Sequence, residues 1–165
     1  MAFSAYLCYN YFTGGVSMKI LVDADGCPVV NEAVFLAKKF QIPCFLFADT
    51  AHRFEKDGAT TVIVDKGADS ADFALANRAS AGDIVITQDY GVASMCLAKG
   101  AHVLHQDGWE YTLDNIDALL LVRHESRKLR AAGNRFKGAK KRSVAQNQAF
   151  FAALLHLLQT VSQGY

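Results

Sequence analysis

The stretch ILVDADGCPVV, residues 20–30, ends a short apolar run with two closely spaced carboxylates. Residues 20–22 are continuously apolar, as in a strand of a parallel sheet that helices cover on both faces. Asp23 closes this run, and Asp25 follows two residues later. Because burial of an unpaired carboxylate is unfavourable, such a pair requires a cation, a hydrogen-bond network or contact with solvent. The stretch therefore predicts a buried strand that ends at a polar site.

Short strand-like runs alternate with helix-like segments along most of the chain. The expected strands are residues 19–23, 44–48, 60–64, 83–87 and 102–105, and the expected helices are residues 28–40, 71–79, 91–99, 113–132 and 144–160. Thr112 is a suitable N-cap for the fourth helix, and Ser143 with Gln146 forms a capping box for the fifth. Because such alternation implies right-handed crossovers, it predicts an α/β fold with three layers, α/β/α, around a mostly parallel central sheet.

Length and composition indicate one globular domain. The chain has 165 residues, of which 52% are hydrophobic and 20% are charged, so it is long enough for a core and too apolar for a disordered chain. No apolar run reaches the roughly 18 residues that a membrane span needs. Residues 1–17 carry no charge and lack the features of a secretory signal. We expect them to be an N-terminal extension or an expression remnant, and residues 18–160 to form the domain.

The four cysteines lie far apart, without a CxxC pair or a zinc-binding spacing. This usage indicates reduced thiols and predicts a cytoplasmic protein. Because no apolar run is long enough for a membrane span, we also expect no membrane partner. The sequence leaves a homo-oligomer open.

Charge is distributed asymmetrically along the chain. Residues 1–122 carry 8 Lys and Arg against 15 Asp and Glu, whereas residues 123–142 carry 9 Lys and Arg against the single Glu125. A basic run is often a solvated helix face, but here almost no acids are interleaved to pair with the bases. The segment 123–142 is therefore a candidate track for the backbone of single-stranded RNA. The residues expected to contact nucleic acid are Arg123, Arg127, Arg130, Lys137, Lys140, Lys141 and Arg142.

Further acids follow the other expected strands. In an open parallel sheet, sites form at the carboxyl ends of the strands, near the switch in strand order. Asp69 and Asp72 share a face at the start of a helix, and Asp89 comes two residues after the fourth strand. If the first and fourth strands are neighbours, these side chains converge with Asp23 and Asp25. Clustered carboxylates favour Mg²⁺ or Mn²⁺ over zinc, and such an ion supports hydrolysis of a phosphodiester.

Helix capping is another explanation for several of these acids. Asp69 and Asp72 could be first-turn acids that the helix dipole favours, and Asp89 could cap the helix that follows it. Asp23 is harder to explain in this way, because an acid that closes a buried strand is uncommon without a function. The prediction of a metal site therefore depends on the combination of acids.

Four blocks of the sequence resemble the YaiI/YqxD family of bacterial proteins, which are similar to PIN-like nuclease domains. The blocks are VDADGCPV (22–29), GADSADFALANRASAGDIVITQDYGVAS (67–94), KGAHVLHQDGWEYTLDNI (99–116) and GAKKR (138–142). The resemblance extends over roughly residues 18–158 and implies a PIN-like nuclease fold. In that comparison Asp23, Asp69 and Asp89 match the catalytic, metal-binding acids, possibly with Asp72, and Thr87 matches a supporting hydroxyl. Where family members tend to carry acids near the start of the last helix, this chain has residues 145–147, AQN.

The leading functional hypothesis is a divalent-metal-dependent PIN-like ribonuclease. A haloacid-dehalogenase-like phosphatase is an alternative, because Asp-x-Asp-Gly after a strand also opens that superfamily, with Asp23 as nucleophile and Asp25 as acid and base. Cys27 in place of the expected Thr, followed by Pro28, argues against it. A third hypothesis is a non-catalytic RNA-binding module, which would bind RNA in a salt-dependent way after its carboxylates are removed.

Overall fold

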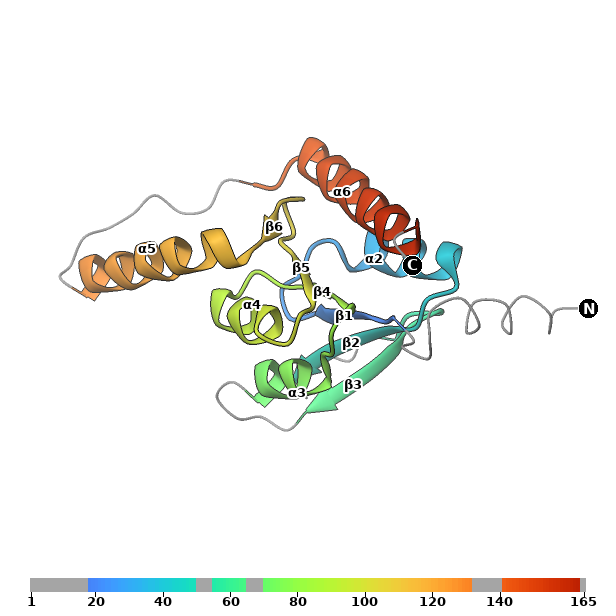
Figure 1. Cartoon of the computed structure of the whole chain (residues 1–165), viewed down its shortest axis with the longest axis horizontal. Helices are drawn as coiled ribbons and strands as arrows, with labels where there is room; N and C mark the ends of the chain where they lie inside the picture. Colours follow the sequence, from blue (N-terminus) through green and yellow to red (C-terminus); the bar gives the residue numbers. More distant parts are fainter. Residues whose placement is uncertain (1–17, 50–54, 65–69, 132–140, 164–165) are drawn as a thin grey trace, which may run out of the picture.

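A mostly parallel sheet forms the centre of the molecule. The computed structural model describes residues 18–49, 55–64, 70–131 and 141–163. Within these residues, six strands form one sheet in the order β3-β2-β1-β4-β5-β6 (Figure 1). They are β1 (Ile20–Asp23), β2 (Cys44–Asp49), β3 (Thr60–Val64), β4 (Ile84–Ile86), β5 (His102–Leu104) and β6 (Glu110–Tyr111). β1 pairs in parallel with β2 on one side and with β4 on the other, so the strand order switches between β1 and β4.

The five strands expected from the sequence are present as β1 to β5, whereas β6 is a strand that the sequence did not predict. Residues 107–111 belong to none of the strands expected from the sequence. Gly108, at φ 86°, does turn the chain, but Glu110 and Tyr111 then pair antiparallel to β5. A strand of two residues has no alternation by which it could be recognised, since period-2 patterns need several residues.

Helices cover both faces of the sheet (Figure 1). They are α2 (Val30–Phe40), α3 (Ser70–Arg78), α4 (Tyr90–Leu97), α5 (Leu113–Ala131) and α6 (Val144–Gln163). Ile20 and Val22 belong to the core beneath α2 and α6, whereas Leu21 belongs to the core beneath α3 and α4. This alternation of β1 side chains between two cores confirms the three-layer α/β/α arrangement.

The expected caps fix the starts of the last two helices. Thr112 and Asn115 exchange hydrogen bonds at the start of α5, and Ser143 and Gln146 do the same at the start of α6. α2 begins at Val30 and not at Pro28 as expected, because Val29, at φ −113° and ψ 18°, lies outside the helical conformation.

α5 extends away from the sheet (Figure 1). Ile116 is its buried residue, and Leu119 and Leu120 pack against the core beneath α3 and α4. Further along the helix, Leu121, Val122 and Leu129 are exposed. None of the helices in the described ranges is both long and apolar enough to cross a membrane.

Candidate functional site

A buried hydroxyl connects the end of β1 with the loop that follows β4. The Oγ1 of Thr87 donates a hydrogen bond to Asp23 Oδ2 at 2.9 Å and accepts one from the backbone N–H of Asp89 at 3.0 Å. Thr87 is only 2% exposed. The hydroxyl therefore fixes the position of the Asp23 carboxylate relative to Asp89, at the point where the strand order switches.

The Asp23 carboxylate lies in an environment that disfavours its charge. Burial raises its pKa from 3.8 to about 6, against the lowering effect of the Thr87 hydrogen bond. The negative charges of Asp72, Asp25 and Asp89 raise this pKa further. A perturbed acid at a sheet edge, close to three other carboxylates, is the kind of group that marks a functional site.

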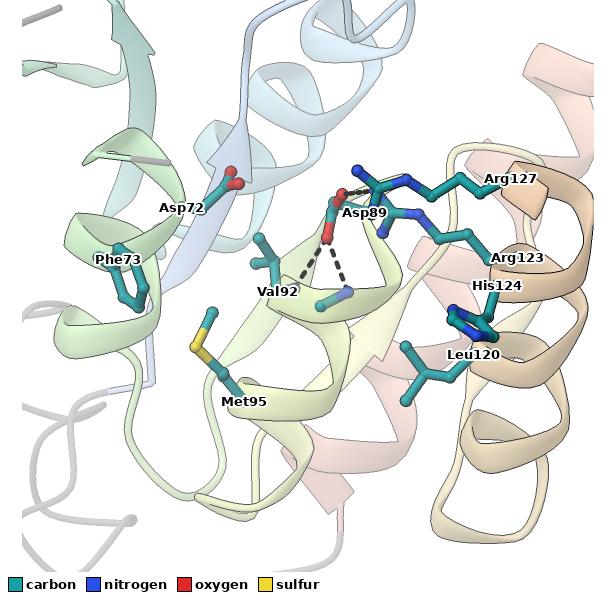
Figure 2. Close-up of a pocket in the computed structure, with 10 residues that line it drawn as sticks. Asp72, Phe73, Asp89, Val92, Met95, Leu120, Arg123, His124 and Arg127 are labelled. Carbon is teal, nitrogen blue, oxygen red and sulfur yellow. Dashed lines mark hydrogen bonds and ion pairs between the residues drawn. The ribbon is translucent and has the colours of Figure 1, made fainter. Parts of the chain in front are cut away.

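Asp89 is held by both of its carboxylate oxygens. Oδ1 accepts hydrogen bonds from the backbone N–H groups of Gly91 (2.7 Å) and Val92 (3.1 Å), so Asp89 is the N-cap of α4. Oδ2 pairs with the guanidinium of Arg123 at 2.9 Å (Figure 2). Although burial raises the pKa of Asp89, the hydrogen bond from Arg123 and those from the two backbone groups lower it below its usual value. Asp89 therefore both caps α4 and belongs to the cluster of acids around Asp23.

Asp23, Asp72 and Asp89 line one cavity of about 570 Å³, which we call the acidic cavity. They come from β1, α3 and the β4–α4 loop, so elements far apart in the sequence form the site together. The other lining residues are Gln88, Tyr90, Arg123 and Arg130. The guanidinium of Arg123 also lies 5.8 Å from the centre of the Tyr90 ring. The positive helix α5 thus contributes two arginines directly to a cavity that carries three carboxylates.

Asp25 is placed differently from the other described acids. The chain turns at Asp25 and Gly26 in place of continuing as an extended strand, and Gly26 has φ 71°. The Asp25 carboxylate accepts a hydrogen bond from the backbone N–H of Asp49 at 2.8 Å. It therefore binds the end of β2 and is not part of the lining of the acidic cavity. Asp69 lies outside the described residues.

The basic residues divide into two groups. Arg123 and Arg130 line the acidic cavity, and Arg127 lines the pocket beside it. Arg142 is used inside the molecule: its guanidinium pairs with Asp107 and donates to the carbonyl of Gln106 and to Asn147. A carboxylate and a carbonyl of the same chain thus bind Arg142, and its contact with nucleic acid stays a prediction. Lys141 is exposed, and Lys137 and Lys140 lie outside the described residues.

The carboxylates fit a divalent ion by their chemistry but are not arranged around one. Hard oxygen ligands are those that Mg²⁺ and Mn²⁺ prefer. Burial and the neighbouring acids raise the pKa of Asp23, and a bound cation would offset the negative charge of these acids. Among residues 18–49, 55–64, 70–131 and 141–163, however, no group of three or more Asp, Glu, His or Cys has the geometry of a metal site. Asp89 Oδ2 already has a cationic partner, the guanidinium of Arg123 at 2.9 Å.

Sequence reasoning missed several residues of the site. Gln88 and Tyr90 flank Asp89 and could have been included because they belong to the same loop. Phe73 is adjacent to Asp72, yet a single aromatic residue at a helix start carries no signal of its own. Leu120 and His124 line the neighbouring pocket because α5 packs against α4, and that contact depends on the tertiary structure.

Residues 21–160 match the model of a family described as "Uncharacterized BCR, YaiI/YqxD family". Three similar proteins are each called UPF0178 protein. The one from Exiguobacterium sibiricum is 45% identical over 141 residues, 86% of this chain and 96% of that protein. The one from Alkaliphilus oremlandii is 46% identical over 141 residues, 86% and 91% of the two chains. The one from Ruminiclostridium cellulolyticum is 48% identical over 147 residues, 89% and 96% of the two chains. No solved structure shows a significant match.

Proposed function

We propose that this chain, which belongs to the YaiI/YqxD family, is a divalent-metal-dependent hydrolase of the PIN-like nuclease type that cleaves single-stranded RNA. This family membership agrees with the resemblance to the YaiI/YqxD family that four blocks of the sequence carry. The observation that carries the proposal is the acidic cavity, where Asp23, Asp72 and Asp89 meet Arg123 and Arg130. Carboxylates bind a hard cation and guanidinium groups bind a phosphate, so the cavity combines the two kinds of group that phosphodiester hydrolysis requires.

The three carboxylates of the cavity are the residues that would hold Mg²⁺ or Mn²⁺, with Asp69 as a further candidate. When bound there, such an ion supplies the positive charge that lowers the pKa of a water molecule and stabilises a leaving oxygen. Thr87 would keep the Asp23 carboxylate in place through its 2.9 Å hydrogen bond. This arrangement also gives a reason for an otherwise unfavourable group, because the pKa of Asp23 is raised to about 6 by burial and by its acidic neighbours.

Arg123 has two roles in this proposal. In the free protein its guanidinium pairs with the Asp89 carboxylate at 2.9 Å. When the cavity is occupied, the same guanidinium would instead pair with a substrate phosphate. A guanidinium pairs with phosphate through two parallel N–H groups, so the exchange replaces one charge-assisted contact with another. Arg130 lies in the same cavity and would bind the same phosphate or its neighbour.

A non-catalytic RNA-binding module is the second candidate, and one observation favours it. Both oxygens of Asp89 are already engaged, by Arg123 and by two backbone N–H groups of α4. In such a module the carboxylates would hold α5 in place and the arginines would bind RNA. The phosphatase alternative has less support, because the Asp25 carboxylate binds the Asp49 N–H and does not line the acidic cavity.

The experiment that tests the proposed function compares three forms of the full chain with labelled single-stranded RNA and Mn²⁺. They are the wild type, Asp23→Asn, and Asp57→Asn as a matched control, because Asp57 is exposed and pairs with Lys38. We expect the wild type and Asp57→Asn to cleave, and Asp23→Asn to be inactive. Equal cleavage by all three forms would contradict the proposal and indicate a contaminant. Binding without cleavage by every form would favour the non-catalytic module.

A further inference from the structure

A second pocket adjoins the acidic cavity and has a different character. It encloses about 590 Å³, and Asp72, Asp89 and Arg123 line both hollows. Away from these shared residues its lining becomes largely apolar. We call this pocket the α4 groove, because Val92 and Met95 of α4 form part of it. A charged cavity that continues into an apolar groove suits a ligand with a charged part and a flat apolar part.

Three helices supply the apolar end of the α4 groove. Phe73 comes from α3, Met95 from α4, and Leu120 with His124 from α5, as Figure 2 shows. Phe73 directly follows the acid Asp72 in the sequence and is 54% exposed. An exposed phenyl ring beside a polar site offers a face on which a planar group can stack, and it gains buried area only when such a group is bound.

We propose that the α4 groove binds a nucleobase next to the phosphate held in the acidic cavity, with Phe73 as the stacking platform. The inference rests on the proposed function, because it assumes that the acidic cavity receives an RNA phosphate. Stacking on an aromatic ring is the usual way in which proteins hold unpaired bases, and it tolerates any base. A base that reaches the groove must be unpaired, so the groove makes single-stranded RNA the substrate class.

Charge and continuity favour a nucleotide over other occupants. Arg123 and Arg127 line the groove at its charged end, where a sugar–phosphate chain would enter. A purely apolar peptide side chain would leave these guanidinium groups unused. The groove volume of about 590 Å³ lies within the range of small-molecule sites.

The test measures RNA binding in EDTA, so that hydrolysis does not interfere. Fluorescence anisotropy compares a labelled oligoadenylate with a strand of the same length that lacks its bases. The variant is Phe73→Ala, and Phe35→Ala is the matched control, because Phe35 is 57% exposed and belongs to α2 on the other face of the sheet. We expect Phe73→Ala to weaken binding of the oligoadenylate about tenfold, and to leave binding of the baseless strand unchanged. Phe73→Tyr should restore binding, and Phe35→Ala should bind both strands as the wild type does.

Three outcomes would overturn the inference. They are unchanged binding of the oligoadenylate by Phe73→Ala, an equal loss for both strands, and no RNA binding by the wild type. A separate cleavage assay with Mn²⁺ distinguishes this failure from failure of the proposed function. Binding that depends on Phe73 without any cleavage would support the base site and overturn the nuclease proposal. Cleavage by the wild type with no effect of Phe73→Ala on oligoadenylate binding would support the nuclease proposal and overturn the base site.

Discussion

Asp23 is a carboxylate whose position lowers the stability of the molecule. Its pKa is about 6 in the folded chain against 3.8 for the unperturbed group, first because it is buried and then because other acids surround it. The folded state therefore binds this proton more tightly than the unfolded state, and wild-type stability falls as pH rises from 3.8 to about 6. Above a pH of about 6, the ionised Asp23 lowers the free energy of unfolding by its full amount.

Replacement of this charge should stabilise the protein while abolishing its proposed activity. In EDTA at neutral pH, we expect Asp23→Asn to raise the free energy of unfolding by about 2 kcal/mol, because the amide carries no charge and can still accept from Thr87. Urea unfolding at several pH values measures this, and the fall in stability between pH 3.8 and about 6 should be smaller in the variant. Asp57→Asn should give no gain, because Lys38 lowers the pKa of Asp57. Equal stability of Asp23→Asn and the wild type at all pH values would contradict the argument.

Thr87 is the second residue whose side chain can be tested directly. Thr87→Val keeps the shape of the side chain but removes both hydrogen bonds, to Asp23 and from the Asp89 N–H. We expect a loss of about 1–3 kcal/mol of unfolding free energy, measured by urea unfolding, together with loss of RNA cleavage. Thr87→Ser retains the hydroxyl and should keep most of the cleavage. If Thr87→Val cleaves RNA as well as Thr87→Ser does, the hydroxyl has no positioning role.

At the level of single residues, the sequence predicted part of the site. It identified Asp23, Asp72 and Asp89 because strand ends of a parallel sheet meet at one edge, and the structure brings them to one cavity. It placed Asp25 with the other acids, but the chain turns at Asp25 and Gly26, and the Asp25 carboxylate binds the backbone N–H of Asp49. It could not foresee the internal role of Arg142, since the partner Asp107 is 35 residues away in the chain.

Among the elements, α5 links the charge pattern to the site. Arg123, Arg127 and Arg130 were expected to contact nucleic acid, and all three line the two adjoining pockets. The contact of these arginines with the acids could not be read from spacing, because it depends on how α5 packs against α4. Helix caps, by contrast, are local signals, and those of α5 and α6 could be predicted from Thr112 and Ser143.

The role of α5 in RNA binding can be tested with two substitutions that remove the same charge. Arg123→Gln should weaken binding of single-stranded RNA, and the slope of log K against log salt should become shallower by about 1, because one phosphate contact is lost. Lys128→Gln is the control, since Lys128 is exposed on the same helix and lines neither pocket. Titrations over a series of salt concentrations measure both. Identical slopes for the two variants would show that the arginine face does not contact the phosphates.

β6 depends on the turn before it, and that turn can be tested as an element. At Gly108, φ is 86°, and an added Cβ would lie 2.7 Å from the backbone carbonyl carbon of Ala149 in α6. We expect Gly108→Ala to lower the free energy of unfolding by about 1–3 kcal/mol, as measured by urea unfolding. Gly100→Ala is a milder comparison, because φ there is 80° but the nearest atom to the added Cβ would be the side-chain Cβ of Ala81 at 3.3 Å. A smaller loss for Gly108→Ala than for Gly100→Ala would refute the argument.

For the whole molecule, the layer order and the parallel sheet could be predicted because alternating apolar runs and helical segments determine them. The two-sided burial of β1 followed from its continuous apolarity, with Leu21 facing one core and Val22 the other. The sequence could not predict how the acidic strand ends and the basic helix approach each other, since that depends on how α5 packs against α4.

Metal binding should stabilise the molecule as a whole if the proposed function is correct. An ion that binds only the folded state raises the melting temperature in proportion to the logarithm of its concentration above Kd. We expect the wild type to show a rise with Mn²⁺ and Asp23→Asn to show none, measured by differential scanning fluorimetry. Arg123→Gln should respond more strongly than the wild type, because the Asp89 Oδ2 that pairs with Arg123 becomes available to the ion. An equal response of the wild type and Asp23→Asn would place the ion elsewhere.

Thr87 contacts both Asp23 and the backbone of Asp89, and this has a consequence for how the site tolerates change. Substitutions at Asp23 and Thr87 will not combine as independent events, because the two side chains share one hydrogen bond. A double-mutant cycle on Asp23 and Thr87 should therefore give a coupling energy above the roughly 0.5 kcal/mol typical of independent sites. In an evolving lineage, the first substitution in this pair would change the effect of the second, so the two positions would be gained or lost together.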